Sequence, residues 1–533
     1  MRDAATAAGN ANVKLLETHI SYVLLTGRFA YKIKKTVDLG FLDFTTLSRR
    51  RFFCHEELRL NRRLAPSLYL DVVPITGTVD APMIGGEGAA LEYAVKMHEF
   101  PQDALASHAS SRHELSAAHI DALAKDVATF HLAAARATPG APFGAADGIR
   151  RFALQNFGRI RPLLTHPSDL VELDALRQWT LSEHATIAHA IEGRRLGDYV
   201  RECHGDLHLN NIALIDGCPV IFDCIEFDDA LRWIDVMSEV AFTVMDLQDR
   251  GQNTLAARFL NAYLEITGDY RGLEVLRFYL IYRAMVRAMV VCERAHQLDA
   301  GQAQSALVAE YRGYVALAKR FTEPPRPALI ITHGLSGCGK TTWSQRALEA
   351  LGAIRIRTDV ERKRLHGIDS RDHGHAGIDT DLYGAKATRE TYRCAVVIAR
   401  DALASGSVTI IDGAFLMRWQ RRMFRQLAAE LGVPFVIVDL AADVSALRGR
   451  IARRSLDAND ASDADLTVLD HQLRTREPLA VDELADTVTV DANESLEAMQ
   501  ASASWGGIME RIASLRSIAT VAIDRQTTPA FAL

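Results

Sequence analysis

The sequence has no paired cysteines, no apolar segment long enough to span a membrane and no excess of basic residues. Its seven cysteines are scattered along the chain without a C-x-x-C pair, whereas a disulfide framework or a zinc site needs paired spacing. The first 14 residues lack the apolar core of a signal peptide. We therefore expect a cytoplasmic protein with reduced thiols.

The charge and hydropathy patterns argue against two further classes of protein. The 61 Lys and Arg residues against 67 Asp and Glu residues give a net charge of −6. Because a nucleic-acid groove normally carries a basic excess, nucleic acid is a disfavoured partner.

The most apolar helical stretch, 276–292, contains Arg277, Arg283 and Arg287. A bilayer span needs about 20 mostly apolar residues, so this stretch is predicted to be a buried helix, with no membrane insertion.

The main domain boundary is predicted at a cluster of prolines. The segment 323–327 (EPPRP) cannot continue a helix, since each proline lacks a backbone donor and restricts the residue before it. An apolar run of strand type follows at 328–334. At about 150 residues per domain, a chain of 533 residues allows two to four domains. We predict a first domain over 1–322, a second over 326–500 and a C-terminal extension over 501–533.

The two predicted domains differ in their secondary-structure pattern. In the first, an N-lobe of about 1–97 mixes strands and helix. A C-lobe of about 98–322 is mostly helical, with a loop-and-strand segment at 199–229. In the second domain apolar strands alternate with helices, which indicates a parallel α/β sheet. The strands of this sheet are predicted at 328–333, 408–412 and 434–439.

The second domain begins with a phosphate-binding motif. Residues 334–341 (GLSGCGKT) match G-x-x-x-x-G-K-[ST] at every fixed position. Glycines in such a loop let backbone N–H groups curl around phosphate oxygens, and the following helix presents its positive N-terminal end. Lys340 is predicted to reach the β- and γ-phosphates, and the Thr341 hydroxyl to ligate Mg²⁺. The residues expected to bind the nucleotide are Gly334, Ser336, Gly337, Cys338, Gly339, Lys340, Thr341 and Thr342.

Two carboxylates downstream favour phosphoryl transfer over a mechanical ATPase. Asp359 is placed to take the proton of an acceptor hydroxyl, and Arg362 to steady the acceptor or the phosphate. The alternative for Asp359 is a helix N-cap. Asp412 ends the apolar strand 408–412, where a Walker-B-like carboxylate organises Mg²⁺. The alternative for Asp412 is a turn residue.

An arginine-rich segment, 447–455, completes the second domain's motifs. It supplies Arg450 and Arg454, which on a mobile lid would reach the transferring phosphate; the alternative is a solvated basic helix face. With these features the region 326–495 resembles the P-loop kinases of small molecules and 5′-hydroxyl ends, the group of gluconate-kinase-like, polynucleotide-kinase-like and zeta-toxin-like enzymes. The resemblance implies ATP as donor and an adenylate-kinase-like core, and it leaves the acceptor open.

The first domain carries a second kinase constellation. Residues 204–211 (HGDLHLNN) fit H-[RG]-D-x-x-x-x-N, the catalytic-loop spacing of the protein-kinase-like fold, and Asp223 follows an apolar strand. In this arrangement Asp206 orients an acceptor hydroxyl as a base, while Asn211 and Asp223 hold Mg²⁺ against ATP. Each feature alone has another explanation. HGD also fits a polar turn, and Asp223 also fits the cap of a strand. Asp235 is the expected buried carboxylate behind the HGD loop.

The N-lobe supplies the remaining parts of this site. The sequence FAYK, which ends at Lys32, is similar to the V-A-I-K pattern of kinases. It makes Lys32 the predicted phosphate-binding lysine, with Lys34 on the same strand face as its rival. Glu57 in the next helix is the predicted partner carboxylate, and Glu56 is the alternative. Because no G-x-G-x-x-G precedes the lysine, Ser21 is the expected phosphate contact.

These motifs resemble the aminoglycoside phosphotransferase and choline-kinase-like family over about 19–320, with HGD in place of HRD and FDCIEF in place of D-F-G. The family has the α+β protein-kinase fold and mostly phosphorylates small hydroxyl compounds, which implies ATP, Mg²⁺ and a small-molecule acceptor. The lack of an A-P-E-like segment after Asp223 argues against protein substrates. Together the halves are similar to bacterial proteins that fuse such a domain to an α/β P-loop NTPase domain with a parallel sheet.

Three functional hypotheses follow. In the favoured one, both domains phosphorylate hydroxyls of sugar-, amino-sugar- or nucleoside-like compounds. In the second, one nucleotide site controls the other. In the third, the protein modifies aminoglycosides. Glu226, Asp228 and Asp229 offer negative charge for this, and a helix cap or a surface loop explains them equally well.

Overall fold

A computed structural model of the chain describes residues 13–40, 42–299, 301–368, 384–454 and 466–492, together with 508 and 510–513. It contains two compact units, the first formed by Met1–Gln252 and Val275–Thr322 and the second by Asn253–Glu274 and Glu323–Leu533. One boundary lies at the proline cluster. The predicted first domain, 1–322, differs from this division at residues 253–274, which pack with the second unit.

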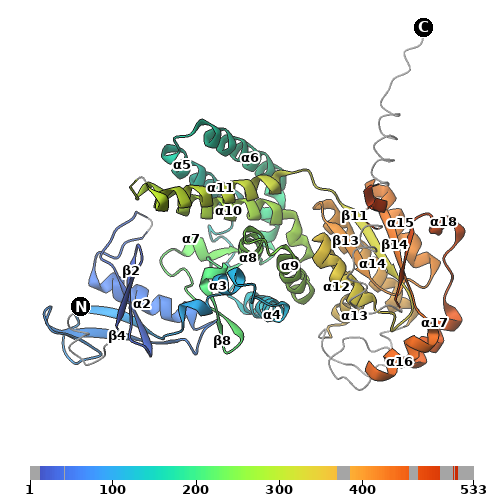
Figure 1. Cartoon of the computed structure of the whole chain (residues 1–533), viewed down its shortest axis with the longest axis horizontal. Helices are drawn as coiled ribbons and strands as arrows, with labels where there is room; N and C mark the ends of the chain where they lie inside the picture. Colours follow the sequence, from blue (N-terminus) through green and yellow to red (C-terminus); the bar gives the residue numbers. More distant parts are fainter. Residues whose placement is uncertain are drawn as a thin grey trace, which may run out of the picture. The chain divides into compact units, whose positions relative to one another are not determined.

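The N-lobe of the first unit is a six-stranded antiparallel sheet with one long helix against it (Figure 1). Helix α2 (Leu47–Asn61) begins after Thr46, whose hydroxyl accepts the N–H of Arg49, and packs against β4 and β6. In the sheet order these strands are β1 (Lys14–Glu17), β2 (Ser21–Leu25), β3 (Phe29–Lys34), β6 (Glu92–His98), β4 (Tyr69–Gly77) and β5 (Pro82–Ile84).

Strand β3 carries the two candidate lysines. Lys32 lies opposite Val23 of β2 and Val95 of β6, and Lys34 lies opposite Ser21. Side chains two residues apart on a strand point to the same face. Lys32 and Lys34 therefore share one face of the sheet.

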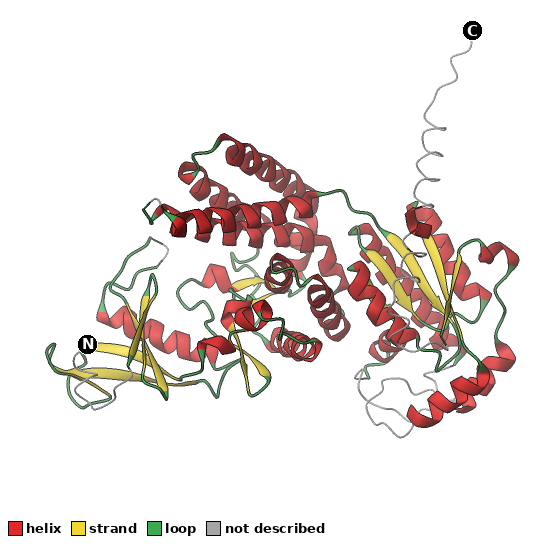
Figure 2. Cartoon of the chain, viewed as in Figure 1, coloured by secondary structure: helices red, strands yellow, loops and turns green. Residues whose placement is uncertain are grey.

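The C-lobe is mostly helical, with two short antiparallel strand pairs (Figure 2). Strand β7 (Val200–Glu202) pairs with β10 (Trp233–Asp235), and β8 (Ile212–Ile215) pairs with β9 (Cys218–Ile221). The segment 203–211, which contains the HGD motif, connects β7 to β8. The helices are α3 (Ala106–Ser111), α4 (Ala117–Ala133), α5 (Ala146–Ile160), α6 (Pro167–Leu196), α7 (Asp229–Arg232), α8 (Val236–Asp249), α10 (Leu273–His296) and α11 (Gln302–Thr322).

The apolar stretch 276–292 belongs to α10. Arg283 within it is buried and donates to the backbone carbonyls of Gly205 and Ser238. Among the described residues, no helix is both long enough and apolar enough to cross a bilayer.

The second unit is built on a five-stranded parallel sheet with helices on both faces (Figure 1). This confirms the predicted α/β architecture. The central strand is β11, whose first five residues are all buried, as expected of a parallel strand that is covered on both faces. The strands, in sheet order, are β12 (Ile354–Arg357), β13 (Val408–Asp412), β11 (Ala328–His333), β14 (Phe435–Ala441) and β15 (Thr487–Asp491).

Helices from two parts of the sequence surround this sheet. Helix α9 (Asn253–Thr267), from the segment 253–274, packs beside α12 and β12 (Figure 1). The other helices are α12 (Lys340–Leu351), α13 (Thr358–Leu365), α14 (Ala385–Ala404), α15 (Arg418–Leu431), α16 (Val444–Arg454), α17 (Leu466–Thr475) and α18 (Val481–Leu484).

Part of the predicted C-terminal extension joins the core of the second unit. Ile508 and Ile512 are buried in the same apolar cluster as Ile330 and Leu348. The rest of the extension, apart from 510–513, lies outside the described residues.

Candidate active sites

The first candidate site forms where strand β3, helix α2 and the loop after β9 meet. The Lys32 ammonium lies 2.9 Å from a Glu57 carboxylate oxygen and 2.5 Å from Asp223 Oδ1. Burial alone would lower the pKa of Lys32, but the charges of Asp223 and Glu57 outweigh it and raise the pKa. Glu56 points elsewhere, to Arg59 at 2.9 Å. The structure thus brings together the predicted lysine, its predicted partner and the predicted metal ligand.

Lys34 is a second, fully buried lysine beside the same carboxylate. Its ammonium lies 2.8 Å from the other Glu57 oxygen and pairs with Glu226. Both Lys34 and Glu57 have side chains with no exposed surface, whereas Lys32 retains 12% exposure. Lys34 therefore stabilises Glu57 from the buried side, and Lys32 is the more exposed of the two lysines.

The catalytic-loop residues lie together in the C-lobe. The Asn211 amide donates to Asp206 Oδ2 and to the Asp206 carbonyl, each at 2.9 Å. His208 Nε2 lies 3.3 Å from Asp206 Oδ2. Burial alone would raise the pKa of Asp206, but the charge and hydrogen bond of His208 and the charge of Arg287 lower it well below its usual value. Asp206 is therefore an ionised carboxylate, able to accept a hydrogen bond from a hydroxyl.

Backbone hydrogen bonds tie this loop to Asp223. His204 Nε2 donates to the Phe222 carbonyl at 2.8 Å, and the Phe222 N–H donates to the Asn211 carbonyl at 3.0 Å. Asp223 has a left-handed backbone, φ +64°, and its N–H donates to the Tyr69 hydroxyl. A left-handed non-glycine residue is held there by its surroundings. The amide and carboxylate oxygens of Asn211 and Asp223 are of the ligand type that Mg²⁺ prefers, so the donor set fits the predicted ion.

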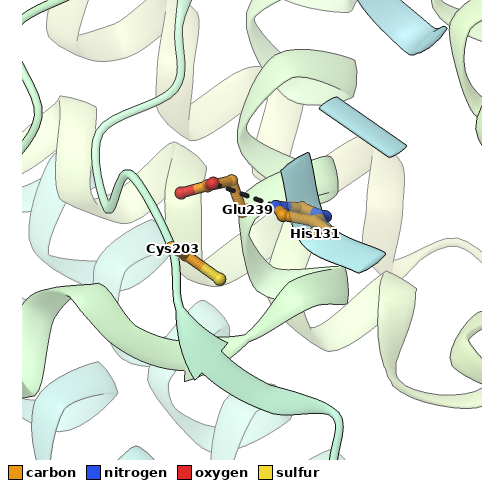
Figure 3. A group of neighbouring side chains, drawn as sticks. All are labelled: His131, Cys203 and Glu239. Atoms are coloured by element: carbon orange, nitrogen blue, oxygen red, sulfur yellow. Dashed lines mark hydrogen bonds and ion pairs between the residues drawn. The ribbon is translucent and has the colours of Figure 1, made fainter. Parts of the chain in front are cut away.

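The carboxylate behind the HGD loop is Glu239 of α8, which the sequence analysis missed. Its oxygens accept the N–H groups of His204 at 2.9 Å and Gly205 at 2.5 Å. One of them also lies 3.0 Å from His131 Nε2 (Figure 3). Asp235, which was predicted for this role, instead forms a buried ion pair with Arg194 at 2.7 Å. The prediction was wrong by one helical turn, since both carboxylates lie on the same buried segment.

His131, Cys203 and Glu239 form a buried cluster of metal-ligand types (Figure 3). Both Glu239 oxygens already accept backbone N–H groups. Burial raises the pKa of the Cys203 thiol well above its usual value, and Glu239 also lies 3.0 Å from His131 Nε2. We interpret the cluster as the support of the catalytic loop.

Gly205 stands where the HRD motif of protein kinases has arginine. Its backbone is left-handed, φ +92°, and a Cβ there would lie 2.8 Å from the Leu231 carbonyl oxygen. Backbone leaves no room to shift at this contact, so only glycine fits.

We expect Glu239→Gln to destabilise the protein by about 1–3 kcal/mol, the cost of leaving buried donors without an acceptor, and to lower first-domain turnover. Burial alone would raise the pKa of Glu239, but its hydrogen bonds to His131 and His204 lower it to about 2. A depressed folded-state pKa stabilises the protein above the unfolded pKa of about 4.3.

The stability difference between wild type and Glu239→Gln should therefore be constant above about pH 5 and shrink as the pH falls from about 4.3 toward 2. Urea titrations across this range measure it. Equal stability of the two proteins at pH 7 would contradict the support role.

Ser21 lies at the start of β2, directly after the tight turn that replaces a glycine-rich loop. Its N–H donates to the Thr18 hydroxyl at 2.9 Å, and its side chain is fully buried. The Ser21 hydroxyl is buried and has no hydrogen-bond partner among the described residues, and its phosphate contact stays a prediction.

The second candidate site is the loop between β11 and α12. Gly334, Gly337 and Gly339 all have positive φ. A Cβ on Gly334 would lie 2.7 Å from Cys338 Sγ and 3.0 Å from the Leu440 carbonyl oxygen. Lys340 Nζ donates to the carbonyls of Gly334 and Leu335, at 3.0 and 2.8 Å. The Ser336 N–H donates to the Gln472 side chain of α17 at 2.8 Å.

Hydroxyl and carboxylate oxygens gather at the start of α12. Thr341 and Thr342 are exposed in its first turn. Asp412, at the end of β13, is buried and accepts a hydrogen bond from Ser344 at 2.9 Å. The Thr341 hydroxyl and the Asp412 carboxylate are hard oxygen ligands and fit a Mg²⁺ ion. Ser344, which connects the helix to Asp412, was not foreseen.

Asp359 and Arg362 lie in α13. They pair at 3.1 Å, with Asp359 half exposed and Arg362 largely buried. The helix N-cap is Arg357, so the capping alternative for Asp359 does not apply. The exposed carboxylate is available to an acceptor.

The predicted lid arginines lie in α16. Arg450 donates to the Ala492 carbonyl at 2.7 Å, and Arg448 pairs with Asp470 of α17 at 2.5 Å. The side chain of Arg454 lies outside the described residues. Because a guanidinium has five N–H donors, this bond leaves others for a phosphate, and the contact of Arg450 with phosphate stays a prediction.

Comparison with known families assigns a class to each region. A family model described as a phosphotransferase enzyme family matches residues 47–279, and one described as an AAA domain matches 329–479. The chain thus joins a region that matches a phosphotransferase family to a region that matches an AAA domain and contains the phosphate loop. Uncharacterized proteins of Mycobacterium tuberculosis and Mycobacterium bovis are each 31% identical to it over 470 residues, 86% of this chain and 90% of theirs. The chain belongs to the family of these mycobacterial proteins.

Parts of the chain match solved structures, among them a gluconokinase and an aminoglycoside phosphotransferase. A gluconokinase from Sinorhizobium meliloti 1021 is 21% identical, covering 38% of this chain and 99% of its own, with a TM-score of 0.25. An ADP-bound aminoglycoside phosphotransferase is 15% identical, covering 60% of this chain and 97% of its own, with a TM-score of 0.31.

Proposed function

We propose that both domains transfer the γ-phosphoryl group of ATP to hydroxyls of small molecules of sugar-, amino-sugar- or nucleoside-like type. The observation that carries the proposal is the first site, in which an ionised Asp206 is bonded to Asn211 and the loop is tied to Asp223 and Lys32. Phosphoryl transfer needs positioned phosphates, a metal and an oriented acceptor, and little other chemistry from the protein.

In the first domain each residue has a separate task. Lys32, held by Glu57, pairs with nucleotide phosphates. Asn211 and Asp223 would hold Mg²⁺, which neutralises charge that develops on the phosphates. Asp206 accepts the acceptor's hydroxyl proton as the oxygen attacks the γ-phosphorus and ADP leaves.

In the second domain the loop amides and Lys340 bind the phosphates, and Thr341 with Asp412 would hold Mg²⁺. Asp359 is the proposed base and Arg362 its partner. We further propose that the protein acts on small molecules in the cytoplasm and not on nucleic acid.

The proposal is tested by a screen of ADP release from full-length protein over a library of hydroxyl metabolites. Wild type, Asp206→Asn, Lys340→Ala and the double variant are compared, with a metabolite-free reaction as control. We expect each single variant to lose a distinct set of acceptors and the double variant to lose all. Identical acceptor profiles for all four proteins would contradict it.

A second candidate is nucleotide sensing, in which one site controls the other. It is favoured by the path of the chain, which enters the second unit twice, at 253–274 and at 323. In this case Lys340→Ala would change turnover of every first-domain acceptor without removing a product of its own.

A further inference from the structure

Helix α9 completes the edge of the second unit's sheet, although its sequence precedes the proline cluster. Strand β12 is the edge strand, and the Asn261 side chain bonds its backbone on both sides. The Asn261 amide donates to the Ala353 carbonyl at 2.8 Å, and its oxygen accepts the Arg355 N–H at 2.7 Å. The amide thus takes the place of a neighbouring strand.

One helical turn further, Glu265 holds two arginines of β12. Its carboxylate lies 3.1 Å from Arg355 and 2.7 Å from Arg357. Burial alone would raise the pKa of Glu265, but the charges of Arg357 and Arg355 lower it. All three groups are therefore charged, and the two arginines share one carboxylate.

The arginine pair reaches the metal-binding end of the phosphate loop. Arg355 Nη1 lies 3.4 Å from Ser344 Oγ and 3.5 Å from the Thr341 carbonyl. Ser344 in turn lies 2.9 Å from Asp412. Asp412 also contributes to the raised pKa of Arg357, after Glu265. A continuous path of polar contacts therefore runs from Glu265 to Asp412.

We infer that Glu265 is a positioning residue for the Mg²⁺ site of the second domain, acting through Arg355 and Ser344 on Asp412. The inference rests on the proposed function, in which Asp412 serves the metal. Glu265 neutralises part of the arginine charge, so that Asp412 remains available to a cation.

Loss of the Glu265 carboxylate is expected to weaken the binding of Mg²⁺ but not the binding of the nucleotide. Two uncompensated arginines would repel Mg²⁺ and attract Asp412, because charges interact strongly where little solvent screens them. The same arginines would not repel a nucleotide, which is anionic. A general loss of structure would weaken both ligands together.

The test compares full-length Glu265→Gln with Glu349→Gln. Glu349 of α12 forms another ion pair with α9, to Arg258 at 2.6 Å, so its variant weakens the same interface without touching Arg355 or Arg357. ATP is titrated calorimetrically with increasing Mg²⁺ and again with EDTA. Binding that disappears in Lys340→Ala is assigned to the second site.

We expect Glu265→Gln to raise the Mg²⁺ concentration at half-saturation about tenfold, with metal-free ATP affinity unchanged or tighter. Glu349→Gln should match wild type, and Glu265→Asp should restore part of the Mg²⁺ affinity. Equal behaviour of the two glutamine variants, or parallel loss of both affinities, would overturn the inference. If wild type has no Lys340-dependent ATP binding, the proposed function of this domain fails as well.

Discussion

Asp206→Asn is expected to lower first-domain turnover by about 10²–10⁴-fold, the usual contribution of a positioned acid–base group, with little change in ATP affinity. The carboxylate interacts with the acceptor hydroxyl and matters mainly in the transition state, whereas an amide cannot take the proton. The variant preserves size, and Asn211 still finds the Asp206 carbonyl as an acceptor. Turnover is measured in a Lys340→Ala background to remove second-site signal.

Asp223→Asn is the matched comparison, since it also exchanges a carboxylate for an amide. Asp223 contacts Lys32 and is placed to hold Mg²⁺, so this variant should weaken Mg·ATP binding as well as turnover. Calorimetry on the full chain distinguishes the two. Unchanged Mg·ATP affinity in Asp223→Asn would refute its metal role, and full turnover in Asp206→Asn would refute the base.

Lys340→Ala is expected to lower second-domain turnover by roughly 10²–10³-fold, as removal of one preorganised donor typically does. Lys340 Nζ donates to the carbonyls of Gly334 and Leu335 in the phosphate loop. From there it can turn to the β- and γ-phosphates. Turnover is followed in an Asp206→Asn background. Its control is Lys319→Ala, which removes a lysine of α11 that pairs with Glu172. Retained activity in Lys340→Ala would refute the phosphate-loop assignment.

The features that the sequence predicted best are local ones. The phosphate loop is a contiguous motif with a strand before it and a helix after it, so its fixed spacing already determines its geometry. Both ends of strand β11 were predicted correctly, because a run such as ALIIT must be buried on both faces. Glu57 was preferred to Glu56, and the structure places it against both lysines.

The features that escaped prediction depend on contacts between distant segments. Asp235 and Glu239 are one helical turn apart, and only the fold decides which one reaches the HGD loop. Glu265 lies in an ordinary amphipathic helix, and nothing near it in the sequence indicates that its partners are Arg355 and Arg357. Such pairings require the three-dimensional arrangement.

The packing of α9 on β12 also has a consequence for protein synthesis. Ninety residues separate Glu265 from Arg355, and at about 5–20 residues per second their translation takes roughly 5–18 s. During that interval Asn261 and Glu265 have been synthesised, but the strand that they bind does not yet exist. The second unit therefore cannot fold as a simple C-terminal domain. A ribosome stalled between these positions would present an unpaired α9 to chaperones and proteases.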